Sequence, residues 1–459
     1  MDAVVFPQKF CRVYPWSPRC EAPYIHPSAQ QQGRKCDIFI KSARIVCKNT
    51  KLFFTFHHKY SRIPDNSDRE RGEIVKTALG MIIRSLKSED IILTFIDNAE
   101  KYGHKIDCVI VAYSLELDSG AAGRINSRVP FFAIDIKDPQ YCAERLRHMG
   151  LPDSAAQPLL VCPVDPLGGL VPYGYKRTLL TTEAIIRGVE TLFFVDSDVS
   201  PGVLKMASSG VITEDADFFG AHLEHLNSGS QVTTGEYSGY NILPPASFDG
   251  MDDLLYGLQK EDMLEYWKKS DSHRCLATQP DERQPKPCTK ILGGNCATKL
   301  EAFSKLPPFF SSYYTVGGEL FLNRGEDTVL GLGIAKNGTV CTDIGLNPLH
   351  DTYKNFPAEP DLHGSLADQE RFYYACTGWV GRNPLYNYVR EADMQSAKEG
   401  RRERLEHGLR ALAKFTNNPR FISVLDNFDV SWSNLGRYIS EYERVMDAWT
   451  QFIRRSDLA

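Results

Sequence analysis

The chain has 459 residues, of which 42% are hydrophobic and 24% are charged, and its formal net charge is −5. This composition is typical of a globular protein with one large domain and an extension, or with two domains. The mildly acidic balance argues against nucleic acid as the main partner, because contacts with a phosphate backbone usually require a basic excess.

No segment approaches the roughly 20 apolar residues of a transmembrane helix, and the first 20 residues lack the apolar core of a secretory signal. The twelve cysteines include no C-x-x-C pair. Cysteines spread in this way are typical of reduced thiols in an intracellular protein. We therefore expect a cytoplasmic protein without a transmembrane segment, and peripheral attachment to a membrane stays open.

The first half of the chain alternates between two patterns. Residues 1–35, rich in Pro, Gln and Ser, predict a loose N-terminal arm. After this arm, short apolar runs alternate with segments whose apolar residues have the spacing of a helix. The runs predict strands at 51–62, 106–118, 129–138 and 191–198, and the helical spacing predicts helices at 72–89 and 175–190.

The second half changes character. We expect strands within 215–227 and 233–245, a helix at 251–270, a glycine-rich turn followed by a helix at 291–310, an apolar helix beginning at Glu326, a strand within 339–353, and helices from 365 to the end. Alternating strands and helices predict an α/β fold with a mostly parallel sheet flanked by helices. We place this domain at 36–360 and a helical C-terminal extension at 361–459.

The most informative stretch is GVETLFFVDSDVSPG, residues 188–202, in which an apolar run ends at two aspartates. Ligands of parallel α/β sheets bind at the carboxyl ends of the strands. Asp196 and Asp198 are expected at such an end, where a loop can bring both carboxylates to one cation. A solvated turn is the alternative, but the four apolar residues before Asp196 indicate a turn that emerges from the core.

Three further polar residues are expected at the ends of elements: Glu326 and Asp327, which open an apolar helix, and His350, near the end of a strand. Mg²⁺ and Mn²⁺ prefer carboxylate oxygens, and Mn²⁺ also accepts imidazole. These ions usually take one or two protein ligands and complete their coordination with phosphate oxygens. Asp198 and His350 are therefore candidates to hold a cation that also binds a diphosphate.

The same FFVDSDVS stretch also fits the D-x-D-x-[ST] loop of haloacid-dehalogenase-type phosphatases. In that hypothesis Asp196 attacks phosphorus and Asp198 acts as acid and base. That motif usually follows the first strand of its domain, whereas at least three predicted strands precede it here. A nucleotidyltransferase remains a further alternative.

Taken together, the segments YKRTLLTTEAIIRGVETLFFVDSDV, GGNCATKLEAFSKLPPF, RGEDTVLGLGIAKNG and NPLH resemble the GT-A-fold glycosyltransferases of the family-two and mannosylglycerate-synthase-like types. The resemblance covers roughly residues 50–355. It implies a GT-A (Rossmann-like) sheet and a hexosyltransferase that uses Mn²⁺ or Mg²⁺ to move a sugar from a nucleotide-diphosphate sugar to an acceptor. The acceptor, whether a glycan, a lipid or a small molecule, stays open.

The resemblance also implies roles for individual residues. Asp198 and His350 would bind the metal, and Asp196 would contact ribose or a metal-bound water. Asp327, with Glu326, would face the acceptor, either as general base or to orient the donor. Donor contacts would come from Lys176 and Arg177, and pocket-lining contacts from Gly293, Gly294 and Asn295.

Some features depart from that family. The segments TFHHKYSR and YSLELDSG stand where it has Pro-x-Tyr/Phe-Asn and DDGS turns, which leaves His57, Glu116 and Asp118 as candidate base or ribose contacts. Within GWVGRNPLYNY, Trp379 and Arg382 would either close the acceptor pocket or dock the C-terminal helices. A binding or scaffold protein on a transferase fold is the non-enzyme alternative.

Overall fold

The computed structural model describes residues 77–208, 210–239, 243–244, 246–264, 284–354, 356–456 and 458. All of them belong to one compact unit, Glu73–Ala459. The predicted arm at 1–35, the predicted strand at 51–62 and His57 lie outside the described residues. Among the residues described, no helix combines the length and apolar character needed to cross a bilayer.

The centre of the unit is an eight-stranded sheet in the order β3-β2-β1-β4-β9-β7-β12-β8. The first four strands pair in parallel, β9 runs antiparallel to both of its neighbours, and β7 pairs in parallel with β12. The bounds are β1 Thr77–Leu86, β2 Cys108–Leu117, β3 Phe131–Asp135, β4 Thr191–Asp196, β7 Val232–Thr234, β8 Lys286–Pro287, β9 Asn295–Lys299 and β12 Cys341–Asp343.

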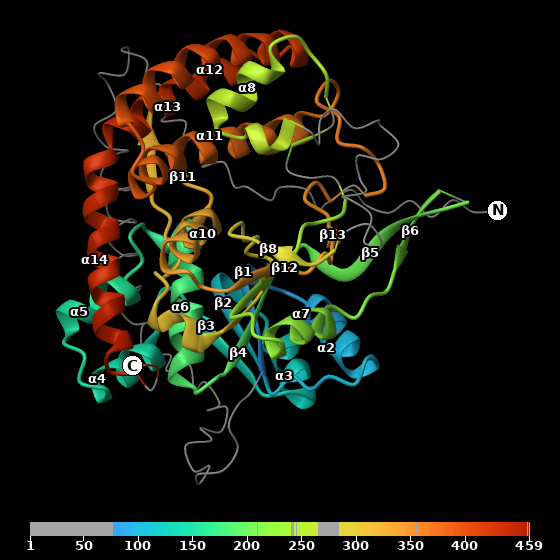
Figure 1. Cartoon of the computed structure of the whole chain (residues 1–459), viewed down its shortest axis with the longest axis vertical. Coiled ribbons are helices and arrows are strands. Elements are labelled where there is room, and N and C mark those ends of the chain that lie inside the picture. The colour runs from blue at the N-terminus through green and yellow to red at the C-terminus, as the bar shows by residue number, and fades with distance from the viewer. Residues whose placement is uncertain are drawn as a thin grey trace, which may run out of the picture. The chain divides into compact units, whose positions relative to one another are not determined.

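Helices cover both faces of this sheet (Figure 1). One face carries α2 (Asp90–Lys101), α3 (Ser119–Arg128) and α7 (Phe218–Asn227), and the other carries α4 (Gln140–His148), α5 (Asp153–Leu160) and α6 (Tyr173–Ile186). Alternate residues of β1 enter different cores: Ala78 and Ile82 pack with the α6 side, whereas Leu79 and Met81 pack with the α2 side. The predicted α/β class with a mostly parallel sheet is therefore confirmed.

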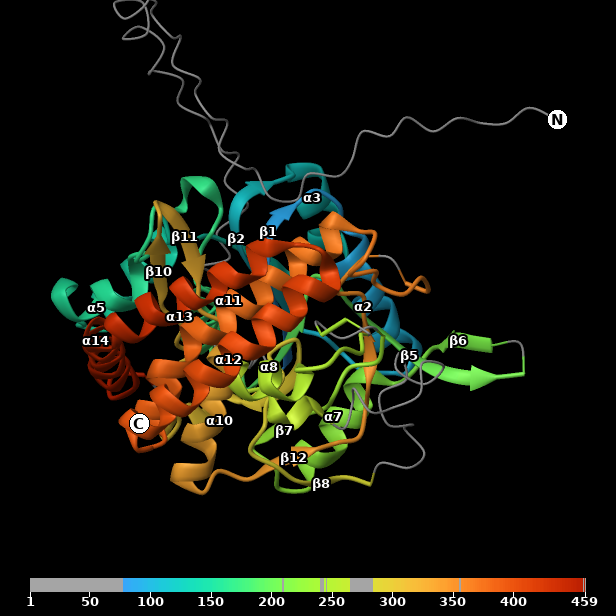
Figure 2. The same ribbon diagram turned by 90° about the horizontal axis from the view of Figure 1, so that it is seen from above.

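The C-terminal part is helical, as predicted. It comprises α11 (Leu366–Val389), α12 (Met394–Thr416), a short 3₁₀ turn η6 (Pro419–Ser423), α13 (Val424–Ser433) and α14 (Leu435–Ile453). Seen from above, α11, α12 and α8 (Met251–Leu258) lie side by side (Figure 2). With the β10–β11 hairpin (Tyr313–Val316, Glu319–Leu322), they share a second apolar core that includes Phe372, Leu409 and Phe428.

A second, smaller sheet and helix α10 (Glu326–Asn337) complete the unit. A second sheet contains β5 (Val199–Ala207), β6 (Gly210–Glu214) and β13 (Pro348–His350) in the order β13-β5-β6. The β5–β6 hairpin projects from the rest of the unit in both views (Figures 1 and 2). The helix α10 packs against the sheet through Leu330 and Ile334. Short 3₁₀ turns occur at Pro166–Gly168 (η1), Glu261–Met263 (η2) and Leu300–Ser304 (η5).

Three predicted elements were wrong. The predicted helix at 72–89 is strand β1 over Thr77–Leu86, because a strand buried on both faces is apolar almost throughout and imitates helical spacing. The predicted strand at 215–227 contains helix α7, which Asp217 caps by accepting a hydrogen bond from the Gly220 amide. The predicted helix within 291–310 is strand β9 followed by η5.

Candidate active site

The site is built around the end of strand β4. Its residues Leu192, Phe193, Phe194 and Val195 are fully buried between β1 and β9. The strand ends at Asp196, a tight turn contains Asp198, and β5 begins at Val199. The side chains of Asp196 and Asp198 remain 28% and 25% exposed. The buried strand β4 is therefore followed at its end by two carboxylates that are partly exposed to solvent.

His350 contacts Asp198 directly. Strand β13 pairs with β5 so that His350 lies opposite Val199, and the Asp351 amide donates to the carbonyl of Asp198 at 3.1 Å. This register brings His350 Nε2 to 3.1 Å from Asp198 Oδ1. The carboxylate and the imidazole that we predicted from the sequence as metal ligands are thus neighbours.

A cation from the C-terminal helices completes this group. Arg371 Nη2 on α11 lies 3.6 Å from Asp198 Oδ2. Burial alone would raise the pKa of Asp198, but His350 and Arg371 outweigh it and lower that pKa to about 2. Burial likewise opposes the charged form of His350, whereas Asp198 and then Asp196 favour it and raise the pKa of His350. Asp198 is therefore a carboxylate at any physiological pH.

Asp196 is held in place from the opposite side. Arg177 of helix α6 is only 2% exposed, and its guanidinium donates to Asp196 Oδ1 at 2.6 Å, Glu326 Oε1 at 3.0 Å and the carbonyl of Gly293 at 2.5 Å. These contacts support a positioning role for Arg177, which ties β4, α10 and the loop at Gly293 to one point.

The acidic pair at the start of α10 divides into two environments. Glu326 is buried against Arg177, and burial, followed by the neighbouring Asp327, raises its pKa. Asp327 is less buried; its Oδ2 accepts from the Gly293 amide at 3.2 Å, and its Oδ1 accepts from the Thr328 amide at 2.7 Å. Glu326 is therefore the buried partner of Arg177, whereas Asp327 is partly exposed and bound by two backbone amides.

The loop Gly293–Gly294 leads into β9 and crosses the site. The Gly294 amide donates to Tyr237 Oη at 2.9 Å. A Cβ at position 294 would lie 2.3 Å from Asp196 Oδ2 and 2.7 Å from Tyr237 Oη, so only glycine allows both groups to approach this backbone. The absence of a side chain at Gly294 therefore allows the Tyr237 hydroxyl and the Asp196 carboxylate to lie against the same stretch of backbone.

Asn295 supports the loop from within. It is fully buried, and its Nδ2 donates to the carbonyls of Glu236 and Leu346 at 2.9 and 3.1 Å. Its Oδ1 is 3.2 Å from His222 Nε2, and the other ring nitrogen of His222 contacts Thr233 Oγ1 at 2.9 Å. These contacts support a role in positioning the glycines rather than in touching a substrate.

Lys176 is the second basic residue of the predicted pair. It is 6% exposed and its ammonium lies 4.6 Å from the centre of the Tyr173 ring. Burial, and then repulsion from Arg177, lower the pKa of Lys176 to about 8, against attraction by Glu326 and Asp196. A buried ammonium without a carboxylate contact among the described residues is suited to receive an anion.

The remaining predicted site residues have other partners. Glu116 forms an exposed ion pair with Lys87, and Asp118 caps helix α3 by accepting from the Ala121 amide at 2.7 Å. Trp379 is buried in the second core. Arg382 donates to the carbonyl of Gln259 and to Asn383 Oδ1, and its chain packs on Gly325. The contacts of Trp379 and Arg382 support their docking of the C-terminal helices.

Sequence inspection missed two residues of the site. Arg371 lies within an unremarkable helical stretch, and no motif marks it. Tyr237 lies in a loop between β7 and α8; its ring centre is 4.5 Å from that of His350, and its hydroxyl accepts from Gly294. The TTGEYSG segment offered only its glycines as a signal for such a loop. Both residues reach the site through tertiary packing.

The donor set fits a hard divalent cation with an incomplete protein shell. In the part of the chain that the structure describes, no three or more His, Cys, Asp or Glu side chains form a metal-ligand group. Asp198 and His350 supply one carboxylate and one imidazole, and both are partly open to solvent. Two protein ligands leave several positions for substrate phosphates and water, and the imidazole favours Mn²⁺ over Mg²⁺.

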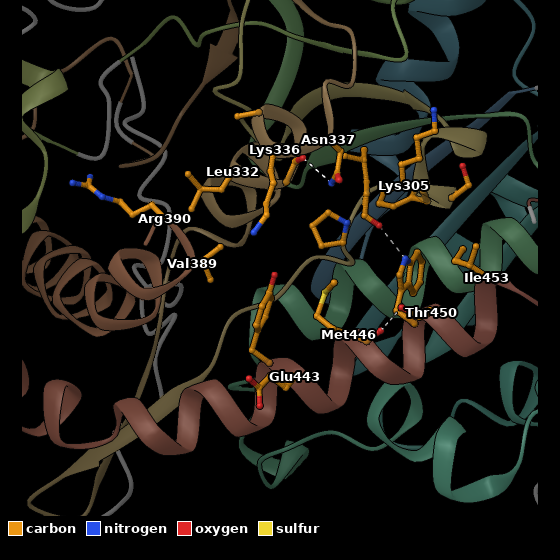
Figure 3. Close-up of a pocket in the computed structure, with 18 of the residues that line it drawn as sticks. Lys305, Leu332, Lys336, Asn337, Val389, Arg390, Glu443, Met446, Thr450 and Ile453 are labelled. Carbon is orange, nitrogen blue, oxygen red and sulfur yellow. Dashed lines mark hydrogen bonds between the residues drawn. The ribbon is translucent and has the colours of Figure 1, made fainter. Parts of the chain in front are cut away.

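A separate hollow of about 1340 Å³ opens at the far end of α10 (Figure 3). It is lined by η5, the last turn of α10, the end of α11 and helix α14, including Leu332, Val389 and Met446. Because α10 rises about 1.5 Å per residue, Lys336 in this hollow lies roughly 13 Å along the helix from Asp327. The hollow is therefore distinct from the candidate site.

Neither a protein-family model nor a curated protein sequence matches this chain. Solved structures with a related arrangement include glucosyl-3-phosphoglycerate synthase from Mycobacterium tuberculosis, in complex with Mn²⁺ and uridine-diphosphate-glucose. It is 15% identical over 67% of this chain and 78% of that one, with a TM-score of 0.32. Mannosyl-3-phosphoglycerate synthase from Rubrobacter xylanophilus is 11% identical over 67% and 74%, with a TM-score of 0.30. At these values the likeness is one of chain path.

Proposed function

We propose that this protein is a metal-dependent glycosyltransferase that moves a sugar from a nucleotide-diphosphate sugar to an acceptor hydroxyl. The observation that carries the proposal is the contact of His350 with Asp198 at the end of the central strand β4. An oxygen ligand and a nitrogen ligand, both partly exposed, meet where α/β sheets bind their substrates.

In this proposal Asp198 and His350 hold Mn²⁺ or Mg²⁺, which would neutralise the charge that develops on the departing diphosphate. Arg371, 3.6 Å from Asp198, adds a fixed positive charge beside the same phosphates. Lys176 adds another from a buried position, where its charge is poorly screened. Asp196 keeps one oxygen on Arg177 and turns Oδ2 toward Gly294 and the Tyr237 hydroxyl.

We propose that the carboxylate of Asp327 faces the acceptor hydroxyl. The amides of Gly293 and Thr328 hold its two oxygens and fix the orientation of the carboxylate. In an inverting reaction it would remove the proton of the acceptor hydroxyl as that oxygen attacks the sugar. In a retaining reaction it would orient the donor sugar.

The phosphatase hypothesis is less well supported. In that hypothesis Asp196 attacks an in-line phosphate, but its Oδ1 is bound by the buried Arg177 and its Oδ2 faces the backbone of Gly294. Three strands of the main sheet also precede β4 in the chain, as the sequence indicated. The arrangement at Asp196 is therefore better suited to holding a ligand than to attacking it.

The proposal is tested by screening nucleotide sugars for Mn²⁺-dependent hydrolysis with the wild-type protein, Asp198→Asn and Asp153→Asn. Asp153 is an exposed aspartate of α5 and serves as the matched control. We expect at least one donor to be hydrolysed by the wild type and the control but not by Asp198→Asn. Equal turnover by Asp198→Asn, or cleavage of p-nitrophenyl phosphate in place of any nucleotide sugar, would contradict the proposal.

A further inference from the structure

Two cysteines face each other at the edge of the main sheet, on the strand pair β8–β12. The antiparallel register pairs Pro287 with Thr342, so Cys288 and Cys341 are the next opposed pair. The Cys288 amide donates to the carbonyl of Cys341 at 3.0 Å. Their sulfurs are 3.4 Å apart, and both cysteines are free thiols. No other pair of described cysteines has sulfurs in contact.

The backbone at this position suits a disulfide. Directly opposed residues of antiparallel strands have Cα atoms roughly 4.5–5.5 Å apart, and disulfides span Cα separations of roughly 4.4–6.8 Å. The two sulfurs need to approach by only a little more than about 1 Å to reach bonding distance. Because β8 is an edge strand of two residues, followed by exposed chain, it can supply this movement.

The two thiols differ in a way that orders the chemistry. Cys341 is buried, whereas Cys288 is partly exposed. The contact with the Cys341 thiol lowers the pKa of Cys288, and the same contact together with burial raises the pKa of Cys341. The accessible sulfur is thus also the better thiolate, and the thiolate is the form that attacks.

We propose that Cys288 and Cys341 form a redox modification site whose reaction partner is a small disulfide of the glutathione type. The Cys288 thiolate attacks one sulfur of the small disulfide, whose other half leaves as a thiolate. Cys341 then loses its proton and attacks the Cys288 sulfur of the mixed disulfide, and the second small thiol leaves. The net reaction turns two protein thiols and one small disulfide into one protein disulfide and two small thiols.

The position of the bond links it to the candidate active site. Two residues after Cys288, Lys290 forms an ion pair with Glu236 at 2.8 Å, and five residues after it, the Gly293 amide binds Asp327. A Cys288–Cys341 bond would fix the start of this segment to β12 and close a covalent ring over residues 288–341. The proposal concerns the two thiols and does not depend on the proposed transferase activity.

Tryptic mapping tests the proposal, because each cysteine lies alone in its tryptic peptide, residues 284–290 and 337–354. The full-length protein is incubated with reduced or oxidised glutathione, the remaining thiols are alkylated at low pH, and the digest is examined by mass spectrometry. We expect the two peptides to be linked after oxidised glutathione and to separate on reduction. We also expect the oxidised protein to unfold at a higher temperature, because a cross-link restricts the unfolded chain.

Two variants make the outcome decisive. Cys288→Ser alters a partly exposed side chain, so it is expected to fold and to lose both the linked peptides and the thermal shift. Cys162→Ser, which removes another partly exposed cysteine, should retain both. Stable glutathionylation of Cys288 without linkage to Cys341, or equal linkage of Cys288 to several cysteines, would overturn the proposal.

Discussion

Replacing Arg177 with Met tests how the site is held together. The guanidinium is 2% exposed and bridges Asp196, Glu326 and the Gly293 carbonyl. Removing one partner of a buried ion pair costs about 3–5 kcal/mol, because the other charge is left buried and unpaired. Glu326, 7% exposed and next to Asp327, would be that charge. We therefore expect Arg177→Met to lower the free energy of unfolding by about 3–5 kcal/mol at pH 8.

The pH dependence of this loss follows from Glu326. Without Arg177 the pKa of Glu326 stays raised by burial, so the folded variant takes up a proton more readily than the unfolded chain. The loss should therefore shrink as the pH falls, and adding Glu326→Gln to Arg177→Met should restore part of the stability at pH 8.

Urea unfolding followed by tryptophan fluorescence measures these differences. The matched control is Arg147→Met, which breaks the ion pair between Arg147 and Asp153. The side chains of these two residues are 60% and 83% exposed. An exposed pair of this kind contributes about 0–1 kcal/mol. If Arg177→Met costs no more than Arg147→Met, or if Glu326→Gln gives no recovery, Arg177 does not neutralise a buried carboxylate.

Three further predictions concern single residues. With its pKa at about 8, Lys176 loses its charge in alkaline solution, so affinity for a nucleoside diphosphate should fall up to roughly tenfold between pH 7 and pH 9 with Mg²⁺ present. Calorimetry should find weaker binding and little of this pH dependence in Lys176→Met, and an unchanged pH profile would exclude the role. Burial lowers the pKa of His222 to about 3, so the unfolded chain takes up a proton below about pH 6.5 that the folded chain does not. The wild type should therefore lose about 2 kcal/mol of stability between pH 7.5 and pH 5 that His222→Gln does not lose, as measured by urea unfolding at both pH values; parallel losses would contradict this origin. Asp327→Asn should reduce transfer by roughly 10²–10⁴-fold if Asp327 is the general base, while leaving donor affinity unchanged. A defect confined to donor affinity would contradict the proposed role.

The sequence predicted the elements whose patterns have one interpretation. The apolar run before Asp196 is too short for a helix and became β4, and the acidic pair before an apolar run became the start of α10. The β1 segment was misassigned because both of its faces are buried, and Gly80, where a Cβ would lie 2.8 Å from Leu180, accommodates α6. Helix α7 was missed although its buried residues Phe218, His222 and Leu226 have the spacing of a helix.

The candidate site likewise contains residues that local sequence patterns mark and residues that only tertiary packing brings in. Asp196, Asp198, Glu326 and Asp327 lie at or beside the ends of elements, where sequence patterns are informative. In the structure Arg177 contacts both Asp196 and Glu326, and Asp327 binds the amide of Gly293, whose carbonyl also contacts Arg177. The register of β13 on β5, which brings His350 to Asp198, depends on pairing between segments 150 residues apart and could only be hypothesised. Arg371 reaches Asp198 through the packing of α11, and no local pattern encodes such a contact.

Calorimetric titration of the protein with UDP and GDP, each with and without Mn²⁺, examines the cation proposed between Asp198 and His350. We expect one of the nucleotides to bind in the presence of Mn²⁺ only, Asp198→Asn and His350→Gln to lose this binding while remaining folded at the temperature of the titration, and Asp153→Asn to keep it. Binding of equal affinity without a divalent cation, or undiminished Mn²⁺-dependent binding by Asp198→Asn, would contradict the proposed site.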